Sequence, residues 1–116
     1  MKFRIPKNTG RFQWTMHSVS KMRQYGLSEN RVKRVINNPR RKELGIAEGT
    51  IAVMQPNSSK HTYEIWAMYQ VINSKFKIQN SKLRIITAWK YPGRSPIRGP
   101  IPIPLEILEE LGELSE

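Results

Sequence analysis

The sequence predicts an α+β fold, in which two N-terminal helices pack on a three- to four-stranded antiparallel sheet. Three observations predict this class. Apolar residues recur at helical spacing up to about residue 37, and they alternate with polar residues between about residues 50 and 90. The two patterns follow one another along the chain and do not alternate. A chain of 116 residues is expected to form one domain around one core.

The chain begins with a predicted irregular leader over residues 1–13, which contains the turn-like "KNTG". A first helix is predicted over residues 16–25. Thr15 is a favourable N-cap for it, and Gly26 supplies a stop signal.

A second helix is predicted from Ser28, its N-cap, to about Asn37, and Pro39 ends it. Its apolar stripe is Val32, Val35 and Ile36, with basic residues on its other sides. The two helices are therefore expected to cover one face of the sheet.

The sheet is predicted from three apolar segments, "TIAVMQ", "HTYEIWAMYQVI" and "LRIITAWKY". The turn "NSSK" joins the first two as an antiparallel hairpin. Strict alternation in the third segment would place Leu83, Ile85, Thr87 and Trp89 on one face. The face away from the helices is expected to be partly open, with four residues on it: Trp66, Met68, Arg84 and Lys90.

The C-terminal part is predicted to be an extended segment followed by a short helix. Residues 92–104, "PGRSPIRGPIPIP", hold five of the eight prolines, so few backbone donors remain for regular structure. Residues 105–116 are predicted to form an acidic helix with a leucine stripe.

Charge is divided unequally along the chain. Residues 1–98 hold all twenty Lys and Arg against four glutamates, a net charge of +16, whereas residues 99–116 hold five glutamates and no cation. A polyanion is the partner that best explains such a body, because each neutralised phosphate releases counterions. The alternatives are an anionic membrane surface, for which no long basic amphipathic helix is present, and a basic surface that serves only solubility.

Several classes of site are excluded or unsupported by composition. There is no cysteine, which excludes disulfides and thiolate metal sites, and the two histidines are far apart with no acidic cluster beside them. We therefore expect no metal and no cofactor. No apolar run is long enough to span a bilayer and the start of the chain lacks an apolar segment, so we expect a cytoplasmic protein without a membrane partner.

His17 is the candidate general base, because it is the only obvious titrating group in a basic setting. The positive end of the helix dipole and Lys21, one turn further on, would both disfavour its protonated form. Lys21 is then the candidate phosphate clamp. The alternative is that this histidine is a local cap, a packed ring or an ordinary surface residue.

Metal-independent RNA cleavage also needs cations at the scissile phosphate. The candidates for this catalytic role are Arg84, Lys90 and Arg94. The candidates for backbone contact with nucleic acid are Arg23, Arg31, Lys33, Arg34, Arg40, Arg41, Lys42 and Arg98. The alternative for the cations that follow Pro39, and for those in the proline-rich segment, is a solvated loop.

The acidic C-terminal helix has two interpretations. The simpler one is a helix whose leucine stripe caps the body. The other is that its glutamates also mask the basic surface, within one molecule or between subunits.

The stretch "HSVSKMRQYGLSENRVKRVINNP" resembles the opening of small bacterial proteins related to RelE-like and BrnT-like toxins. The similar positions are His17, Ser18, Lys21, Met22, Tyr25, Gly26, Leu27 and the closing "NNP". Lys21 stands where arginine is usual in that family, and Tyr25 where a second arginine is common. The segment "KLRIITAWKY" resembles the family's central strand, so that the resemblance covers residues 14–91.

This resemblance implies a ribonuclease-like core that acts on RNA. The leading hypothesis is an RNA-binding protein of RelE-like toxin type that is a metal-independent endoribonuclease, with RNA, on the ribosome or free, as its partner. The second is a non-catalytic basic module that binds RNA or the ribosome. The third is a protein-interaction partner in a toxin–antitoxin pair, whose charge serves an acidic antitoxin.

Overall fold

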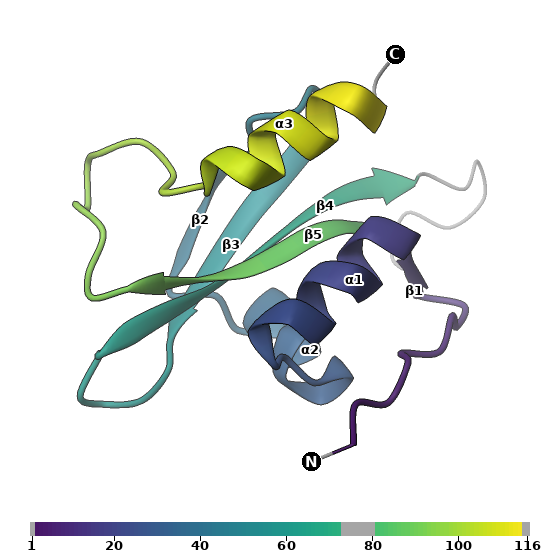
Figure 1. Cartoon of the computed structure of the whole chain (residues 1–116), viewed down its shortest axis with the longest axis horizontal. Helices are drawn as coiled ribbons and strands as arrows, with labels where there is room; N and C mark the ends of the chain where they lie inside the picture. The colour runs from purple at the N-terminus through teal and green to yellow at the C-terminus, as the bar shows by residue number, and fades with distance from the viewer. Residues whose placement is uncertain (1, 73–80, 115–116) are drawn as a thin grey trace.

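The computed structural model describes residues 2–72 and 81–114, and it confirms the α+β class. A five-stranded mixed sheet has the strand order β1-β5-β4-β3-β2 (Figure 1). The expected three- to four-stranded antiparallel sheet therefore gains two short edge strands. These are β1 (Phe12–Trp14), which pairs in parallel with β5 (Lys82–Pro92), and β2 (Arg41–Leu44), which pairs antiparallel with β3 (Thr50–Pro56).

The two predicted helices form where their capping residues place them. In α1 (Met16–Tyr25) the Thr15 side chain accepts a hydrogen bond from the backbone N–H of Ser18, and Gly26 ends the helix at a φ of 67°. In α2 (Glu29–Asn37) the Ser28 side chain accepts from the backbone N–H of Arg31. Both caps satisfy donors that a helix start leaves free.

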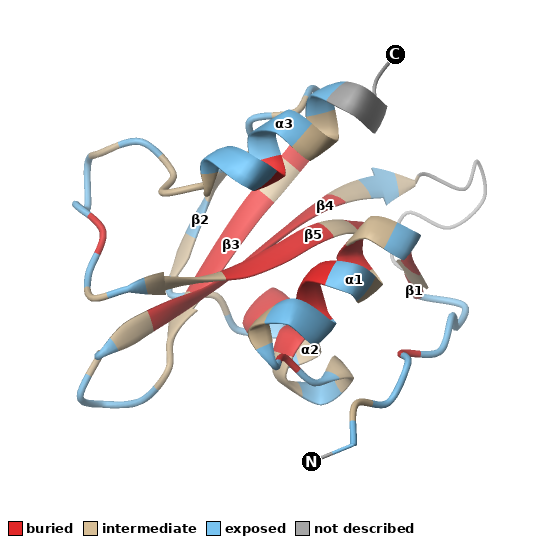
Figure 2. Cartoon of the chain, viewed as in Figure 1, coloured by how far each residue is buried: buried red, intermediate tan, exposed pale blue. Residues whose placement is uncertain are grey.

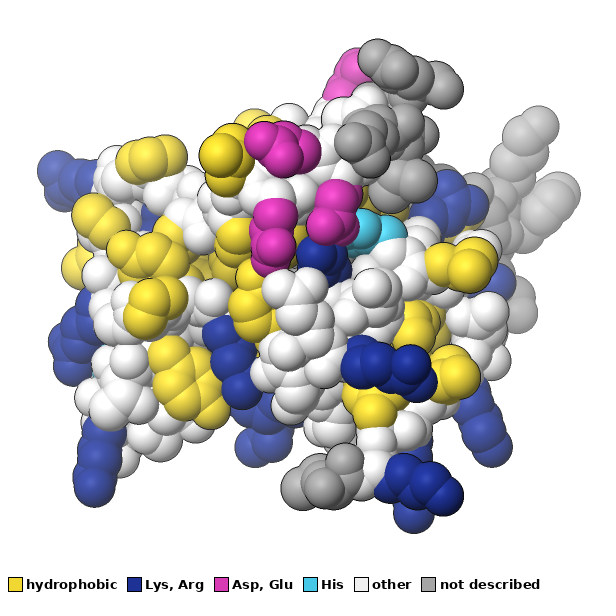
Figure 3. All heavy atoms as spheres, viewed as in Figure 1, with side chains coloured by type: hydrophobic (Ala, Val, Ile, Leu, Met, Phe, Trp, Pro, Cys, Tyr) yellow, Lys and Arg dark blue, Asp and Glu magenta, His cyan; other side chains and the backbone are white. Residues whose placement is uncertain are grey.

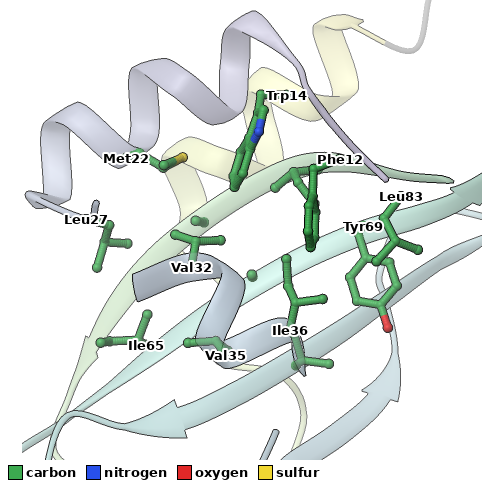
Figure 4. Packing of buried hydrophobic residues seen from close by; sticks show 14 residues of the cluster. Phe12, Trp14, Met22, Leu27, Val32, Val35, Ile36, Ile65, Tyr69 and Leu83 are labelled. Carbon is green, nitrogen blue, oxygen red and sulfur yellow. The ribbon is translucent and has the colours of Figure 1, made fainter. Parts of the chain in front are cut away.

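The first core lies between α1, α2 and one face of the sheet, as Figures 2 and 4 show. Val32, Val35 and Ile36, the predicted stripe of α2, are all buried against the sheet. The alternation in β4 (Tyr63–Ile72) places Ile65, Ala67 and Tyr69 on this face, as predicted.

A bulge reverses the alternation in β5. Met68 pairs with Thr87 but Tyr69 pairs with Ile85, so Ile86 has no partner in β4. Leu83 and Ile85 consequently face the first core, whereas Trp89 faces the other side of the sheet. The expectation that Leu83, Ile85, Thr87 and Trp89 share one face is wrong for this reason.

The second face of the sheet is closed, and the expectation of a partly open face is wrong. Trp66, Met68 and Trp89 are fully buried there, and the two indole rings stack with their centroids 5.8 Å apart. Residues 93–104 and α3 (Leu105–Leu114) cover this face, with Ile107 of α3 buried in the second core (Figures 1 and 2). The predicted helix residues 115–116, and residues 73–80 of the predicted core, lie outside the described residues.

Candidate functional site at the junction of α1 and α3

One face of α1 lies against α3, and we call it the α1 face. It is formed by His17, Lys21, Gln24 and Tyr25, which recur at helical spacing. α1 runs along the edge of β5 beyond the point where β1 ends, held there by hydrogen bonds from Thr15 to the carbonyl groups of Ile85 and Ile86. This position carries the α1 face around the sheet edge toward the second core.

Two glutamates of α3 occupy the α1 face. Glu110 bridges the first two residues: one of its carboxylate oxygens lies 3.2 Å from His17 Nδ1, and the other lies 2.8 Å from Lys21 Nζ. Glu106 Oε1 accepts hydrogen bonds from Gln24 Nε2 at 2.8 Å and from the Tyr25 hydroxyl at 3.1 Å. Figure 3 shows acidic side chains gathered over a histidine and a basic side chain where the two helices meet.

Helical spacing lets each glutamate meet two donors. Glu110 meets His17 and Lys21, which are one helical turn apart, and Glu106, one turn before Glu110 on α3, meets Gln24 and Tyr25. The α1 side of these contacts is shielded from water, since the side chains of His17 and Lys21 are 9% and 5% exposed. The glutamates keep more contact with water, at 49% for Glu106 and 39% for Glu110.

Both ring nitrogens of His17 have partners. Nδ1 faces the Glu110 carboxylate, which only accepts hydrogen bonds, so Nδ1 must carry a proton. In the neutral ring Nε2 then accepts a hydrogen bond from the hydroxyl of Thr87, 3.0 Å away. Thr87 is fully buried on the second face of the sheet, where the β5 bulge has placed it.

Burial lowers the pKa of His17, and the charge of Lys21 lowers it further, while Glu110 opposes both. The direction predicted from the sequence is confirmed, although burial is the largest cause. Burial and the hydrogen bond to Glu106 also raise the pKa of Tyr25 to about 12. The hydrogen bonds from Gln24 and Tyr25 lower the pKa of Glu106. The α1 face thus favours a neutral His17 imidazole and an ionised Glu106 carboxylate.

None of the other predicted catalytic cations makes a hydrogen bond to His17 among the described residues. Arg84 points to the second face of the sheet, opposite Gln70 and three residues before Thr87. Lys90 lies on the opposite face, with its Nζ 5.1 Å from the centroid of the Tyr63 ring. Arg94 is exposed in the proline-rich segment. Of the five candidate catalytic residues, His17 and Lys21 are the two that described contacts join, through Glu110.

The predicted nucleic-acid contacts divide into free and engaged cations. Arg41 is engaged: its guanidinium donates to Ser95 Oγ at 3.0 Å and to the carbonyl of Gly99 at 2.7 Å, and it lies over the Trp66 ring. Arg31 donates to Gln55, and Lys33 pairs with Glu29. The predicted cations that are exposed are Arg23, whose guanidinium lies over the Phe3 ring, and Arg34, Arg40, Lys42 and Arg98.

Glu64 is a buried carboxylate that sequence reasoning did not single out. It accepts hydrogen bonds from Ser95 Oγ at 2.6 Å and from Trp66 Nε1 at 3.1 Å, and His61 Nε2 lies 2.9 Å away. The serine donates to the carboxylate and not to the histidine, so this is not the relay of a serine hydrolase. The hydrogen bonds between Glu64 and Ser95 anchor the proline-rich segment to the sheet.

No family model, curated protein or solved structure matches the chain. No helix in residues 2–72 and 81–114 is long and apolar enough to cross a membrane. In the same part of the chain, no group of three or more histidines and acidic residues is arranged to hold a metal ion.

Proposed function

We propose that the protein binds RNA and that the α1 face is part of the surface that holds the phosphate backbone. One observation carries this proposal: four side chains of one helix face converge on two carboxylates. Lysine, imidazole, amide and phenol groups that hold carboxylate oxygens present the same donors to phosphate oxygens. The α1 face is therefore an anion-binding surface that α3 fills from within the same molecule.

The distribution of charge supports RNA as the anion. The net charge of +16 on residues 1–98 makes the body a strong attractor for a polyanion. The exposed cations have no ion-pair partner among residues 2–72 and 81–114, so they are free to contact a backbone. Figure 3 shows Lys and Arg side chains around the margin of the face that carries the α1–α3 junction.

Endoribonuclease activity of RelE-like type is the finer part of the proposal. His17 would take the proton from a 2′-hydroxyl, and Lys21 would hold the phosphate. A general base needs an accessible nitrogen, and while α3 is docked Nδ1 faces its Glu110, whereas Nε2 contacts Thr87 of β5. Departure of α3 would free Nδ1. Cleavage therefore requires α3 to leave the α1 face. The resemblance of residues 14–91 to RelE-like toxins is the further support for this chemistry.

The test compares two double variants with the same change in charge. Glu106→Gln with Glu110→Gln weakens the cover, whereas Glu48→Gln with Glu109→Gln removes two exposed glutamates that make no ion pair among the described residues. Binding of a labelled single-stranded RNA is measured at several salt concentrations. The first variant is expected to bind more tightly than the second, and wild-type affinity is expected to fall steeply with salt. Equal affinity of the two variants would contradict the role of the α1 face.

Cleavage is measured in the same experiment with EDTA present. Loss of cleavage in His17→Ala with binding retained would support an endoribonuclease. Binding without cleavage in any variant would leave the non-catalytic RNA or ribosome-binding module.

A protein partner is the second candidate function, and the structure gives it a specific reason. What the α1 face holds is an acidic amphipathic helix, so an acidic helix of an antitoxin is a ligand of the same chemistry. Absence of RNA binding at ~50 mM salt, where phosphate contacts are strong, would favour this candidate.

A further inference from the structure

A pocket of about 460 Å³ lies at the far end of α2 from its N-cap, away from the α1 face. One wall is the loop that follows α2, with Asn38, Pro39 and Arg40. The other wall is the turn between β3 and β4, with Ser58 and Ser59. Its volume is in the range that holds a small organic ligand.

The floor of the pocket is fixed before any ligand arrives. Gln55 donates hydrogen bonds to the carbonyl groups of Arg34 and Asn38, and it accepts one from Arg31. Arg31 also donates to the carbonyl of Pro56, which lines the pocket. These contacts satisfy carbonyl groups at the end of α2 and join the end of α2 to the end of β3.

The turn wall is also pre-formed. The Asn57 side chain donates to Thr62 Oγ1 and accepts from the backbone N–H of Tyr63, so it closes the turn at its base. His61 has a φ of 51°, a left-handed conformation that this closed turn maintains. Ser58 and Ser59 are thereby presented on a defined loop.

Three polar side chains at the rim of the pocket have no hydrogen-bond or ion-pair partner among the described residues, whereas those of the α1 face have partners in α3. The side chains of Asn38, Arg40 and Ser59 make no hydrogen bond or ion pair with any residue that the structure describes, and Asn38, Arg40 and Ser59 are exposed. An amide, a guanidinium and the Ser59 hydroxyl thus line a concavity with their hydrogen-bonding capacity free, while the Ser58 hydroxyl oxygen accepts a hydrogen bond from the backbone N–H of Lys60. Pro39 and Pro56 supply apolar surface beside them.

The electrostatic setting selects an anion. None of the residues that line the pocket is acidic, and Arg40 is one of them. Arg31 and Arg34 both contact the Gln55 floor. Burial lowers the pKa of Arg31, and the nearby charge of Arg34 lowers it further, which reports like charges in close proximity.

We propose that this pocket is a nucleotide subsite, in which Arg40 holds a phosphate and Asn38 with the serine hydroxyls reads the edge of an unstacked base. The ligand class is a nucleotide of single-stranded RNA, because an unstacked base exposes the edge that these side chains would read, whereas the pairing edge of a base in a duplex is occupied. This inference rests on the proposed RNA binding and adds to it the position of one nucleotide.

The experiment uses the full chain and four nucleoside 5′-monophosphates, with inorganic phosphate as the comparison. Backbone amide signals are followed by NMR during each titration. Saturable shifts are expected at Arg40, Ser58 and Ser59, with at least one nucleotide bound more tightly than phosphate. Shifts of equal size and midpoint for phosphate and every nucleotide would overturn the base-reading part and, with it, the subsite.

Two variants and a matched control sharpen the test. Arg40→Gln removes one charge-assisted hydrogen bond and is expected to weaken nucleotide binding about tenfold. Arg4→Gln, an exposed residue outside the pocket, changes the charge equally and is expected to change binding less than about twofold. Asn38→Ala is expected to reduce the difference among the four bases. Equal effects of Arg40→Gln and Arg4→Gln would refute the subsite.

The two proposals fail in distinguishable ways. RNA binding with no nucleotide shifts in the pocket would refute the subsite and leave the proposed function. Saturable nucleotide binding without any RNA affinity at ~50 mM salt would refute the proposed function and leave the subsite.

Discussion

Replacing Glu110 by glutamine tests how strongly α3 is held on the α1 face. The substitution removes the charge that lies 2.8 Å from Lys21 Nζ and 3.2 Å from His17 Nδ1, while it keeps the side chain's shape. Removing one partner of a fully buried pair destabilises a protein by about 3–5 kcal/mol, whereas exposed pairs contribute about 0–1 kcal/mol. Lys21 is buried and Glu110 is 39% exposed, so the expected loss of unfolding free energy is about 1–2 kcal/mol.

The measurement is urea unfolding followed by tryptophan fluorescence, because Trp66 and Trp89 lie in the core that α3 covers. Glu109→Gln is the control, since Glu109 is exposed on the same helix. Its effect is expected to stay within about 0.5 kcal/mol. Equal stability of the Glu110 and Glu109 variants would refute the reasoning, because the bridging contact would then add nothing to the docking of α3.

Three other perturbations have defined outcomes. The NMR titration of His17 should give a midpoint below 6.5, because burial lowers its pKa. Stability should therefore fall as the pH drops below about 6.5 and through that midpoint, and a midpoint above 6.5 would contradict the burial argument. Burial would raise the pKa of Glu64, but hydrogen bonds from Ser95, His61 and Trp66 lower it overall. Protonation of Glu64 should therefore contribute to the loss of wild-type stability below about pH 4, and this contribution to acid unfolding should be absent from Glu64→Gln. Ile107→Ala should lower the unfolding free energy by about 2–4 kcal/mol in urea melts, and a loss below about 1 kcal/mol would show that the second core does not need α3.

Local sequence signals were sufficient for the helices. Thr15, Gly26 and Ser28 each have a conformational or hydrogen-bonding preference that acts within a few residues, so the bounds of α1 and the start of α2 follow from them directly. The alternation in β4 is equally local, and it places Ile65 and Ala67 in the first core as expected.

Features that depend on pairing between distant segments could not be predicted from local sequence signals. β1 consists of only three residues, and it forms because Phe12–Trp14 pairs with Leu83–Ile85, about seventy residues away. The bulge at Ile86 is a property of the pairing between β4 and β5, and no residue type in "LRIITAWKY" marks it. That bulge moves Thr87 to the face where it contacts His17.

The candidate site was predicted in part. His17 and Lys21 share a helix face as their spacing requires, but the groups that meet them come from α3 and β5. α3 caps the body through Ile107 and Leu111, although Leu105 and Leu108 are exposed, and its Glu106 and Glu110 in addition cover the α1 face, as the masking interpretation expects. The helical spacing of hydrogen-bond donors along α1 and of glutamates along α3 was the available signal for this docking.

The most direct measurement of the central claim is an NMR titration of the full chain with a short single-stranded RNA, in which the His17 ring and the backbone amides of α1 and α3 are observed together. If the α1 face receives phosphate where α3 places its carboxylates, the His17 ring signals and the α3 amides will shift in one saturable step, and added salt will reverse it. If RNA binds while the signals of His17, Lys21 and α3 stay unchanged, the α1 face is not an RNA surface.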